Sequence, residues 1–486
     1  MSRDIAAPDT TARRTAGCDA QGSHETTRHA AVRRTTAAML MVLGGTIHLA
    51  SAAGPTDHAE KYWPQWRGPS ATGVAPHADP PIEWSESNNI RWKVQIPGRG
   101  HATPIVWGDR VYVQTAVKTD REAEPNASPE PSDRSGRHRR GGRDWMGSVE
   151  PTHIHAFTVL ALDRRTGNTV WEKVVAQTLP HEGGHRDASQ ASNSPVTDGR
   201  HVFAHFGSRG LYCLDMQGRL VWNKDLGRMQ TRMGFGEGSS PVLHGDTIVV
   251  NWDHEGQSFI VALDKRTGDV RWRVDRDEPT SWATPIIVTV NGRAQVVTSA
   301  TNRIRSYDLA TGDIVWESGG MTRNVIPSPV RGDGLVYAMS GFRGSAVRAI
   351  RYADAAGDIT DSAAVAWTYA GKGTPYVPSP LLYGDTLYFL DNNRAILSCF
   401  DAKHGKPYYT KQRLDGLRGI YASPVGARDR VYIVGRNGKT AVIKRGTEFH
   451  VLATNTLDDD FSASPAIVDG ELYLRGAKYL YCIAEK

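Results

Sequence analysis

The stretch Ser239–Trp272, SSPVLHGDTIVVNWDHEGQSFIVALDKRTGDVRW, decides the fold of this chain. It begins with Ser-Ser-Pro and carries an apolar run, a Gly-Asp turn, a β-branched run, a further apolar run that ends at Asp264, a Thr-Gly turn and a terminal Trp. Short apolar runs bounded by Gly and Asp turns are typical of strands, and two-residue turns are typical of hairpins. The stretch therefore predicts four antiparallel strands, which cannot bury both faces of their sheet alone.

The same unit recurs along the chain, each time from a Ser-Pro or Thr-Pro pair. Successive pairs are 41 to 51 residues apart, except for a first interval of 91 residues. A period of about 40–45 residues with four strands per repeat is typical of β-propeller blades. The eight starting pairs are Thr103-Pro104, Ser194-Pro195, Ser240-Pro241, Thr284-Pro285, Ser328-Pro329, Ser379-Pro380, Ser423-Pro424 and Ser464-Pro465.

The eighth unit stops after three strands, at Cys482-Ile483-Ala484, and lacks the strand with the terminal Trp. A lone strand that carries Trp92 lies upstream of the first unit and matches the missing one. Pairing the two removes the last open sheet edge. We therefore predict an all-β fold over residues 89–486, an eight-bladed β-propeller of four-stranded antiparallel blades closed by an N-terminal strand.

The Trp and Cys residues follow the repeat. Six of the thirteen Trp occupy one repeat position, which favours a role in packing. Cys213, Cys399 and Cys482 lie just before the Asp position of their repeats, where other copies have small residues such as Ala262. Because each Cys belongs to a different repeat, we predict buried, unpaired thiols where neighbouring sheets pack closely.

Residues 1–52 read as a secretory signal peptide with an over-long polar N-terminal extension. The pair Arg33-Arg34 precedes a short apolar run, Ala37 to Leu49, which is followed by Ala50-Ser51-Ala52. This order is typical of a cleaved leader, and the run is too short to cross a bilayer. We predict cleavage after Ala52, a periplasmic or secreted protein without a transmembrane span, and export by the general or the twin-arginine route. Residues 53–88 form an N-terminal segment before the propeller.

Residues 118–150 are an insertion in the first unit, rich in Pro, Ser, Gly and Arg and without a strand pattern. Five Arg fall between Arg134 and Arg143, after an acid-rich half. We predict a disordered, solvated loop; binding of an anionic partner such as a lipid headgroup is the alternative. The formal net charge of +6 is too small to indicate nucleic-acid binding.

The repeat motif resembles a known family. The hairpin Ala-x-Asp-x-x-Thr-Gly-x-x-x-Trp, the run Trp63-Pro64-Gln65-Trp66-Arg67-Gly68-Pro69 and the run Ile96–Pro104 are similar to those of secreted bacterial PQQ-like (pyrroloquinoline-quinone) β-propeller repeat proteins of the BamB-like, outer-membrane assembly factor type. The resemblance covers about residues 62–486. It implies a fold, whereas one propeller fold hosts enzymes and scaffolds alike.

Two branches of that family imply different functions. The BamB-like branch implies an exported, non-catalytic binding and assembly scaffold in the cell envelope, and it usually carries a lipoprotein Cys that this chain lacks. The other branch implies a PQQ-dependent quinoprotein dehydrogenase that oxidises an alcohol or a sugar, with PQQ, Ca²⁺, a catalytic Asp and a vicinal disulfide, yet this chain has no Cys-Cys pair. We predict the scaffold, with an envelope protein or a small polar ligand as partner and a monomeric propeller, and keep the dehydrogenase as the alternative, with Glu237 or Asp460 as its base.

His181-Glu182-Gly183-Gly184-His185 matches the zinc-protease motif H-E-x-x-H. That chemistry needs a helix, so that both His side chains project from one face. Pro180 and the two Gly residues disfavour a helix, so we predict no metal site here and a loop, with a His at a binding rim as one possibility and a solvated loop as another.

In a propeller, the loops that lead into the blades all meet the same face. Aromatic, guanidinium and carboxylate side chains converging there would form a pocket for a polar ligand or a peptide. We predict no catalytic residue and a ligand-binding rim made of His101, Glu237, Trp282, Arg323, Asn324, Tyr376, Arg418 and Asp460, with Asn193 and Tyr421 in the same loops.

Overall fold

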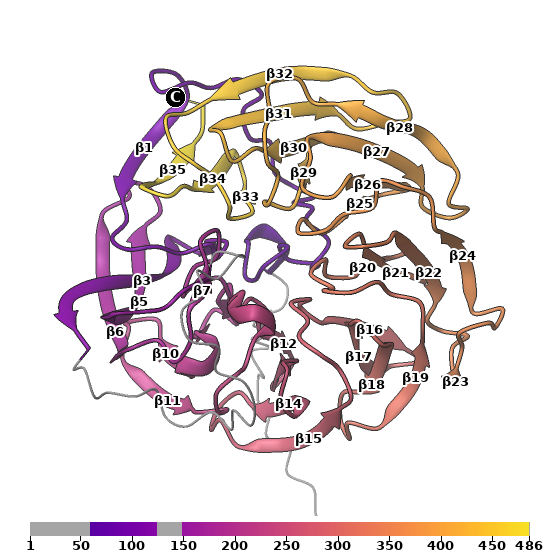
Figure 1. The fold of residues 1–486 in the computed structure, drawn as a ribbon. Helices are drawn as coiled ribbons and strands as arrows, with labels where there is room; N and C mark the ends of the chain where they lie inside the picture. The colour runs from indigo at the N-terminus through magenta and orange to yellow at the C-terminus, as the bar shows by residue number, and fades with distance from the viewer. Residues whose placement is uncertain (1–58, 124–147, 486) are drawn as a thin grey trace, which may run out of the picture. The chain divides into compact units, whose positions relative to one another are not determined.

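The computed structural model describes residues 59–123 and 148–485. Within them the chain forms eight blades around a ring (Figure 1). In each blade the first strand lies toward the ring axis, and the first strands of neighbouring blades contact one another all the way round. The predicted all-β, eight-bladed propeller is therefore confirmed.

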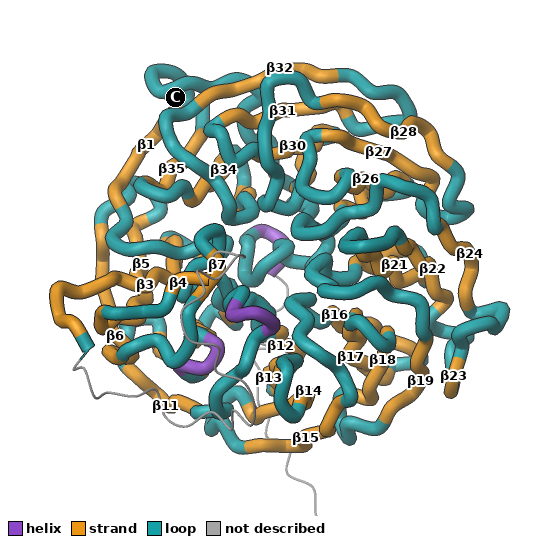
Figure 2. Tube along the Cα trace, viewed as in Figure 1, coloured by secondary structure: helices purple, strands orange, loops and turns teal. Residues whose placement is uncertain are grey.

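The strands follow the chain order within each blade, and strands account for most of the regular structure (Figure 2). Blades 1 to 4 comprise β2 (Ile105–Trp107), β3 (Arg110–Glu122), β5 (His153–Asp163) and β6 (Thr169–Thr178); β8 (Val196–Thr197), β9 (His201–His205), β10 (Leu211–Asp215) and β11 (Leu220–Lys224); β12 (Val242–His244), β13 (Thr247–Trp252), β14 (Ser258–Asp264) and β15 (Val270–Arg276); and β16 (Ile286–Val290), β17 (Arg293–Ser299), β18 (Ile304–Asp308) and β19 (Ile314–Ser318). Blades 5 to 8 comprise β20 (Val330–Gly332), β21 (Leu335–Ser340), β22 (Ala346–Arg351) and β24 (Val365–Tyr369); β25 (Leu381–Tyr383), β26 (Thr386–Leu390), β27 (Ile396–Asp401) and β28 (Pro407–Arg413); β29 (Val425–Ala427), β30 (Arg430–Val434), β31 (Lys439–Lys444) and β32 (Val451–Thr456); and β33 (Ala466–Val468), β34 (Glu471–Arg475), β35 (Tyr479–Ile483) and β1 (Ile90–Gln95).

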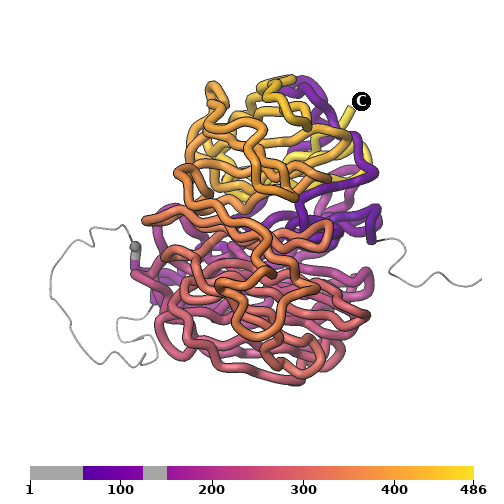
Figure 3. The backbone as a smooth tube through the Cα atoms, turned by 90° about the vertical axis from the view of Figure 1, so that its right-hand side faces the viewer, coloured from indigo at the N-terminus to yellow at the C-terminus, as the bar shows by residue number. Residues whose placement is uncertain are grey.

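Strand β1 completes blade 8, as the sequence predicted. It pairs antiparallel with β35, and Trp92 lies opposite Cys482. The side view in Figure 3 has the first described residues, in indigo, beside the yellow C-terminal strands. The ring thus closes through backbone hydrogen bonds between strands that are far apart in the sequence.

The repeated Trp and the Thr-Gly turn belong to one interlock between neighbouring blades. The indole of Trp92 donates a hydrogen bond to the carbonyl of Arg164 at 2.9 Å, in the first turn after β5 of blade 1. Gly167, in the same turn, has φ +76°, and a Cβ there would lie 2.8 Å from the Trp92 ring. The same pairing of indole and turn recurs for Trp171, Trp222, Trp272 and Trp367.

The residue two positions before the repeat Asp is small because of the Trp that it faces. It lies directly opposite the Trp in the antiparallel register, as Cys213 lies opposite Trp222 and Ala262 opposite Trp272, and a β-bulge follows at once. A larger side chain at this position would compete with the indole for space. The described cysteines Cys213, Cys399 and Cys482 are buried and unpaired, which confirms the prediction for the thiols.

The Ser-Pro and Thr-Pro pairs form a hydrogen-bonded girdle around the axis. In each case the backbone N–H of the Ser or Thr donates to the side-chain hydroxyl of the equivalent residue in the next blade, at 2.8 to 3.0 Å. The bonds run Thr103 to Ser194, Ser194 to Ser240, Ser240 to Thr284, Thr284 to Ser328, Ser328 to Ser379, Ser379 to Ser423 and Ser423 to Ser464. At the seam between blades 8 and 1, the buried Thr103 Oγ1 has no hydrogen-bond partner among the described residues.

The described part of the N-terminal segment crosses one end of the ring. Trp63 exchanges backbone hydrogen bonds with Val106 in blade 1, and Gly73 and Ala75 bond to Gly426 in blade 7. Between these points, the buried Arg67 guanidinium donates to the carbonyls of Pro380 and Pro424, each at 2.7 Å. The segment therefore spans the axis and forms a floor beneath the girdle.

The insertion of blade 1 differs in part from its prediction. Strand β3 continues to Glu122, and β4 (Ser148–Val149) pairs with β7 (Gly184–His185), so both flanks of the stretch 118–150 are ordered. Backbone pairing, rather than an apolar pattern, orders these flanks. Its centre, 124–147, lies outside the described residues, as do the predicted leader and Cys18.

No helix in the described part of the chain is long and apolar enough to cross a membrane.

Candidate functional site

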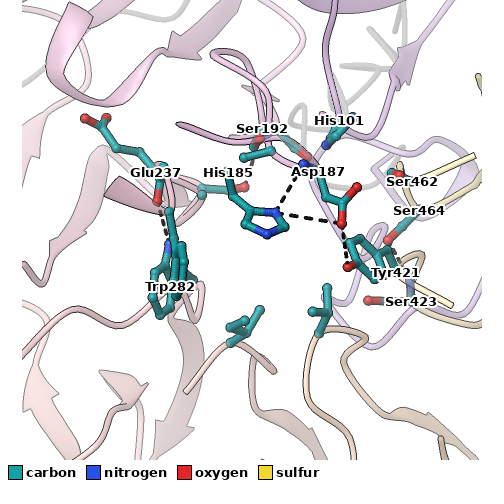
Figure 4. A pocket seen from close by; sticks show the side chains of 18 of the residues that line it. His101, His185, Asp187, Ser192, Glu237, Trp282, Tyr421, Ser423, Ser462 and Ser464 are labelled. Carbon is teal, nitrogen blue, oxygen red and sulfur yellow. Dashed lines mark hydrogen bonds and ion pairs between the residues drawn. The ribbon is translucent and has the colours of Figure 1, made fainter. Parts of the chain in front are cut away.

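A cavity of about 390 Å³ lies on the axis of the propeller, above the girdle (Figure 4). Every blade, or the loop that leads into it, contributes to its wall. The lining consists of Trp66, His101, His185, Asp187, Ala188, Ser192, Ser194, Phe235, Gly236, Glu237, Gly238, Ser240, Trp282, Ile326, Tyr376, Val377, Tyr421, Ser423, Ser462 and Ser464.

Asp187 anchors one polar corner of this cavity. Its carboxylate accepts a hydrogen bond from Nη2 of Arg436 at 2.9 Å and from the Tyr421 hydroxyl at 3.2 Å. The Arg436 guanidinium lies over the Tyr421 ring, 4.5 Å from its centroid. Burial by itself raises the pKa of Asp187, but the hydrogen bond and charge of Arg436 outweigh it and lower that pKa. The corner therefore holds a fixed carboxylate with a compensating guanidinium.

His185 lies beside this corner. Its Nδ1 accepts a hydrogen bond from the backbone N–H of Asp187 at 3.2 Å, which in the neutral ring assigns the proton to Nε2. The imidazole meets the Phe235 ring edge-on at 5.6 Å. Its Nε2–H is thus a donor available to a ligand, while the other nitrogen is used internally.

His101 has an uncharged imidazole near neutral pH. Burial lowers its pKa to about 3, and the nearby Arg99 and Arg436 add to the effect. Its backbone N–H donates to the carbonyl of Ala191 at 3.0 Å, which fixes the loop that leads into blade 1. His101 therefore offers an uncharged imidazole to the cavity wall.

Aromatic side chains form the opposite wall. The Trp282 indole donates to the carbonyl of Gly236 at 2.6 Å, and so fixes the loop before blade 3. Tyr376 stacks on Phe342 with 4.8 Å between ring centroids. These contacts hold flat apolar surfaces in place before any ligand arrives, which reduces the entropy cost of binding.

The predicted rim residues divide into two groups. His101, Glu237, Trp282 and Tyr376 line the cavity, as does Tyr421. The other four lie outside its lining, because only the inner part of each loop reaches the axis: Asn324 is buried behind Tyr376, and Arg323, Arg418 and Asp460 are exposed.

Glu237 belongs to the cavity lining, but its carboxylate is directed away from the cavity (Figure 4). The carboxylate accepts a hydrogen bond from the backbone N–H of Ser208 at 2.6 Å and another from the Ser208 hydroxyl, in the short 3₁₀ helix η2 (Gly207–Arg209). A Cβ at Gly207 would overlap the carboxylate. Burial raises the pKa of Glu237. The side chain thus clamps two loops and does not face a ligand.

The H-E-x-x-H stretch is not helical: it bends at His181-Glu182 and enters β7 at Gly184, and its side chains have different partners. His181 Nε2 contacts the carbonyl of Met229 at 2.6 Å. The Glu182 carboxylate accepts the backbone N–H and the hydroxyl of Thr231, near the 3₁₀ helix η3 (Arg232–Gly234). His185 alone of the motif reaches the cavity. Within 59–123 and 148–485, no cluster of three or more His, Cys, Asp or Glu side chains has the geometry of a metal site.

His185, Asp187 and Arg436 lie outside the predicted rim. His185 belongs to the H-E-x-x-H stretch, for which a loop His at a binding rim is one of the two predicted roles. No sequence pattern indicates Asp187 or Arg436 as a site residue, because their ion pair joins the loop before blade 2 to the loop between β30 and β31 in blade 7.

The cavity residues do not fit a calcium-bound quinone. Ca²⁺ takes about six to eight oxygen ligands, mostly carboxylates and carbonyls. The two carboxylates of the lining are already committed, Asp187 to Arg436 and Tyr421, and Glu237 to Ser208. The donor set that the dehydrogenase branch implies is therefore not assembled around this cavity.

Comparisons with known proteins bear on the family. A family model described as outer membrane protein assembly factor BamB matches residues 155–411, more than half of the chain. A search of curated proteins gives no match.

Several solved structures share the architecture. A quinohemoprotein alcohol dehydrogenase from Comamonas testosteroni has a TM-score of 0.57 at 11% identity, and the match covers 89% of this chain and 85% of that one. A second such enzyme, from Pseudomonas putida HK5, has a TM-score of 0.52 at 11% identity, with 88% and 80% covered. BamB from Moraxella catarrhalis has a TM-score of 0.49 at 14% identity, with 76% and 99% covered. At these identities, the two dehydrogenase structures indicate a shared fold alone. On the family match, the chain belongs to the PQQ-like propeller family described as outer membrane protein assembly factor BamB.

Proposed function

We propose that this protein is a non-catalytic binding propeller of the cell envelope, of the outer-membrane assembly type, and that its axial cavity receives a peptide segment of an envelope partner. One observation carries the proposal: loops from all eight blades build a single cavity with a preformed aromatic wall and an ion-paired polar corner. A volume of about 390 Å³ suits one or two side chains of an extended segment.

The chemistry of the wall favours an aromatic or apolar side chain flanked by backbone amides. Trp282, Tyr376 and Phe235 supply flat apolar surface. The Nε2–H of His185 can donate to a peptide carbonyl. An envelope location is supported by the predicted leader and by the family description.

Binding is favoured over acid–base catalysis by the charge states of the wall. A general base needs a pKa near the working pH. The pKa of Asp187 is lowered, and the pKa of His101 falls to about 3. Neither group combines a matched pKa with an unoccupied basic atom directed at the cavity.

Photo-crosslinking in intact cells tests the proposal. A benzoylphenylalanine introduced at Tyr376 should give a discrete adduct with an envelope protein. The control places the same group at Val221, which is 48% exposed on the outer strand β11. A discrete adduct at position 221 with none at 376 would contradict binding in the cavity.

The dehydrogenase alternative makes a different prediction. Purified protein mixed with PQQ and Ca²⁺ should then change its absorbance and reduce a dye in the presence of an alcohol or an aldose sugar. We expect neither response. Sustained dye reduction that depends on both PQQ and substrate would replace the binding proposal.

A further inference from the structure

A second, smaller cavity of about 160 Å³ lies on the other side of the floor made by the N-terminal segment. Trp66 belongs to the linings of both cavities and so separates them. The wall of this second cavity comes from Gln65, Trp66, Arg67, Pro69, Ser70, Ala71, Pro241, Val242, Leu243, His244, Thr284, Pro285, Ile286, Ile287, Ser328, Pro329 and Arg331.

This lining contains two arginines and a histidine, and no Asp or Glu. Arg67 is 2% exposed, and its Nη groups donate to the backbone carbonyls of Thr72, Pro380 and Pro424. Its Nε–H is buried and has no hydrogen-bond partner among the described residues. A buried guanidinium without a carboxylate is costly, because carbonyl dipoles offset only part of its lost hydration.

Arg331, on β20, adds a second positive charge. Its Nε is likewise buried without a partner, and its side chain forms no ion pair or hydrogen bond with the described residues. Burial lowers the pKa of Arg67 to about 9, as expected for an uncompensated cation, and burial together with Arg331 lowers the pKa of His244. The charges around this cavity are thus all positive or neutral.

We propose that this cavity binds a small tetrahedral oxyanion, phosphate or sulfate, between Arg67 and Arg331. Guanidinium groups match the geometry of such anions and pair with them strongly. A cavity of about 160 Å³ has room for one such ion with water and excludes a nucleotide. The ion supplies the negative charge that the lining lacks and ties the N-terminal segment, through Arg67, to blade 5.

The oxyanion site is separate from the axial cavity, since the two cavities lie on opposite sides of Trp66. Its lining combines two guanidinium groups from distant parts of the chain, Arg67 and Arg331. An ion here stabilises the folded state by mass action, because the unfolded chain does not hold the two arginines together.

Calorimetric titration of the mature protein with inorganic phosphate, in chloride buffer of constant ionic strength, tests this site. We expect one-site binding to the wild type and about tenfold weaker binding to R331Q, from the loss of a charge-assisted hydrogen bond. The matched control is R200Q, which removes an exposed arginine from the first turn of blade 2, the counterpart of the turn beside His244. R200Q should bind phosphate as the wild type does.

Three outcomes would overturn the proposal: no binding to the wild type, equal binding to all three proteins, or acetate binding more tightly than phosphate. Glycerol phosphate mimics a lipid headgroup, so comparing its binding with that of inorganic phosphate distinguishes a lipid-borne phosphate from a free ion. Binding of either compound supports the oxyanion site. If R331Q does not fold, as judged by near-ultraviolet circular dichroism, wild-type crystals soaked in selenate decide the matter. An anomalous peak between Arg67 and Arg331 is then expected, and its absence contradicts the site.

Discussion

Gly167 lies under the indole of Trp92, so close that a Cβ on the glycine would be 2.8 Å from the ring. Trp92 comes from β1 and Gly167 from the turn between β5 and β6, so this contact seals the seam between blades 8 and 1. The same contact recurs at other blade boundaries, where Gly218 meets Trp171 and Gly268 meets Trp222.

Replacing Gly167 by Ala should destabilise the propeller for two reasons, a positive φ and a steric clash. Gly108→Ala provides the control, because Gly108 has φ +59° and a Cβ there would meet nothing within 4 Å. We expect about 1–2 kcal/mol of destabilisation for G108A from φ alone, and about 1–3 kcal/mol more for G167A from overpacking. Urea unfolding measures both. Equal losses would mean that the Trp–Gly contact contributes no steric constraint.

The girdle of Ser and Thr residues yields a second matched pair. Ser240→Ala removes the acceptor of the Ser194 backbone N–H, a buried group, and should cost about 1–3 kcal/mol of stability. The hydroxyl of Thr103 has no such role, because Thr103 Oγ1 has no partner. Thr103→Val removes this unpaired hydroxyl and keeps the Thr103 backbone N–H that donates to Ser194 Oγ, so it should cost less than S240A in the same urea unfolding. A loss for T103V as large as that for S240A would contradict the role of the girdle.

Stability should fall as the pH rises through the range from about 5 to 7, in part because of Glu182. Burial raises the pKa of Glu182 to about 7 from the ordinary value of 4.5, and the neighbouring Glu237 adds to the effect, against hydrogen bonds from Thr231. A raised folded-state pKa means that the native state holds a proton which the unfolded state has already released. Its contribution is therefore fully present below pH 4.5 and is lost as the pH approaches 7.

Glu182→Gln should flatten this part of the stability profile. Melting temperatures measured at half-unit pH steps for the wild type and E182Q provide the comparison. Glu172→Gln, on the exposed face of the outer strand β6, serves as the control and should leave the slope unchanged. An identical slope for the wild type and E182Q would exclude Glu182 as a source.

The Asp187–Arg436 pair should be needed for partner binding. Asp187→Asn and Arg436→Gln each remove one side of a half-buried ion pair, and each should reduce the crosslinking yield at position 376 several-fold. The crosslinking yield of the double variant should be no lower than that of the weaker single variant. In a double-mutant cycle of unfolding free energies, the coupling between the two residues should be about 0.5–3 kcal/mol. Strictly additive losses would mean that the two groups act separately.

Much of the fold could be predicted from the sequence, because the residues that specify it repeat. The Trp, the Thr-Gly turn and the Ser-Pro pair each make a contact with the next blade at most blade boundaries, so one blade describes most of the ring. The closing strand could also be predicted, because the eighth unit lacks its terminal Trp strand and the upstream strand that carries Trp92 matches it. The physical reason for the small residue was predicted less accurately, since it faces the Trp within its own blade as well as the neighbouring sheet.

The site was only partly predictable, because it depends on contacts that do not repeat. His101 and Trp282 lie two residues before the girdle residue of their blades, and that position lines the cavity in all eight blades. Tyr376 lies one residue farther from its girdle residue, at a position that lines the cavity in only one other blade, at Glu237. Arg418 and Asp460 occupy similar loops a few residues farther from the blade start and are exposed. The Asp187–Arg436 pair joins loops that no periodic pattern relates, so the sequence alone contains no signal for it.

The pairing of β1 with β35 has a kinetic consequence. Strand β1 is synthesised before all the blades, and β35 only after seven of them, so blade 8 cannot form until the last described strand is available. Closing so long a loop carries a large entropy cost, and high contact order slows folding. Ring closure is therefore expected to be the late, slow step of folding. A circularly permuted chain in which β1 directly follows β35 would turn that step into the formation of a local hairpin and should refold faster.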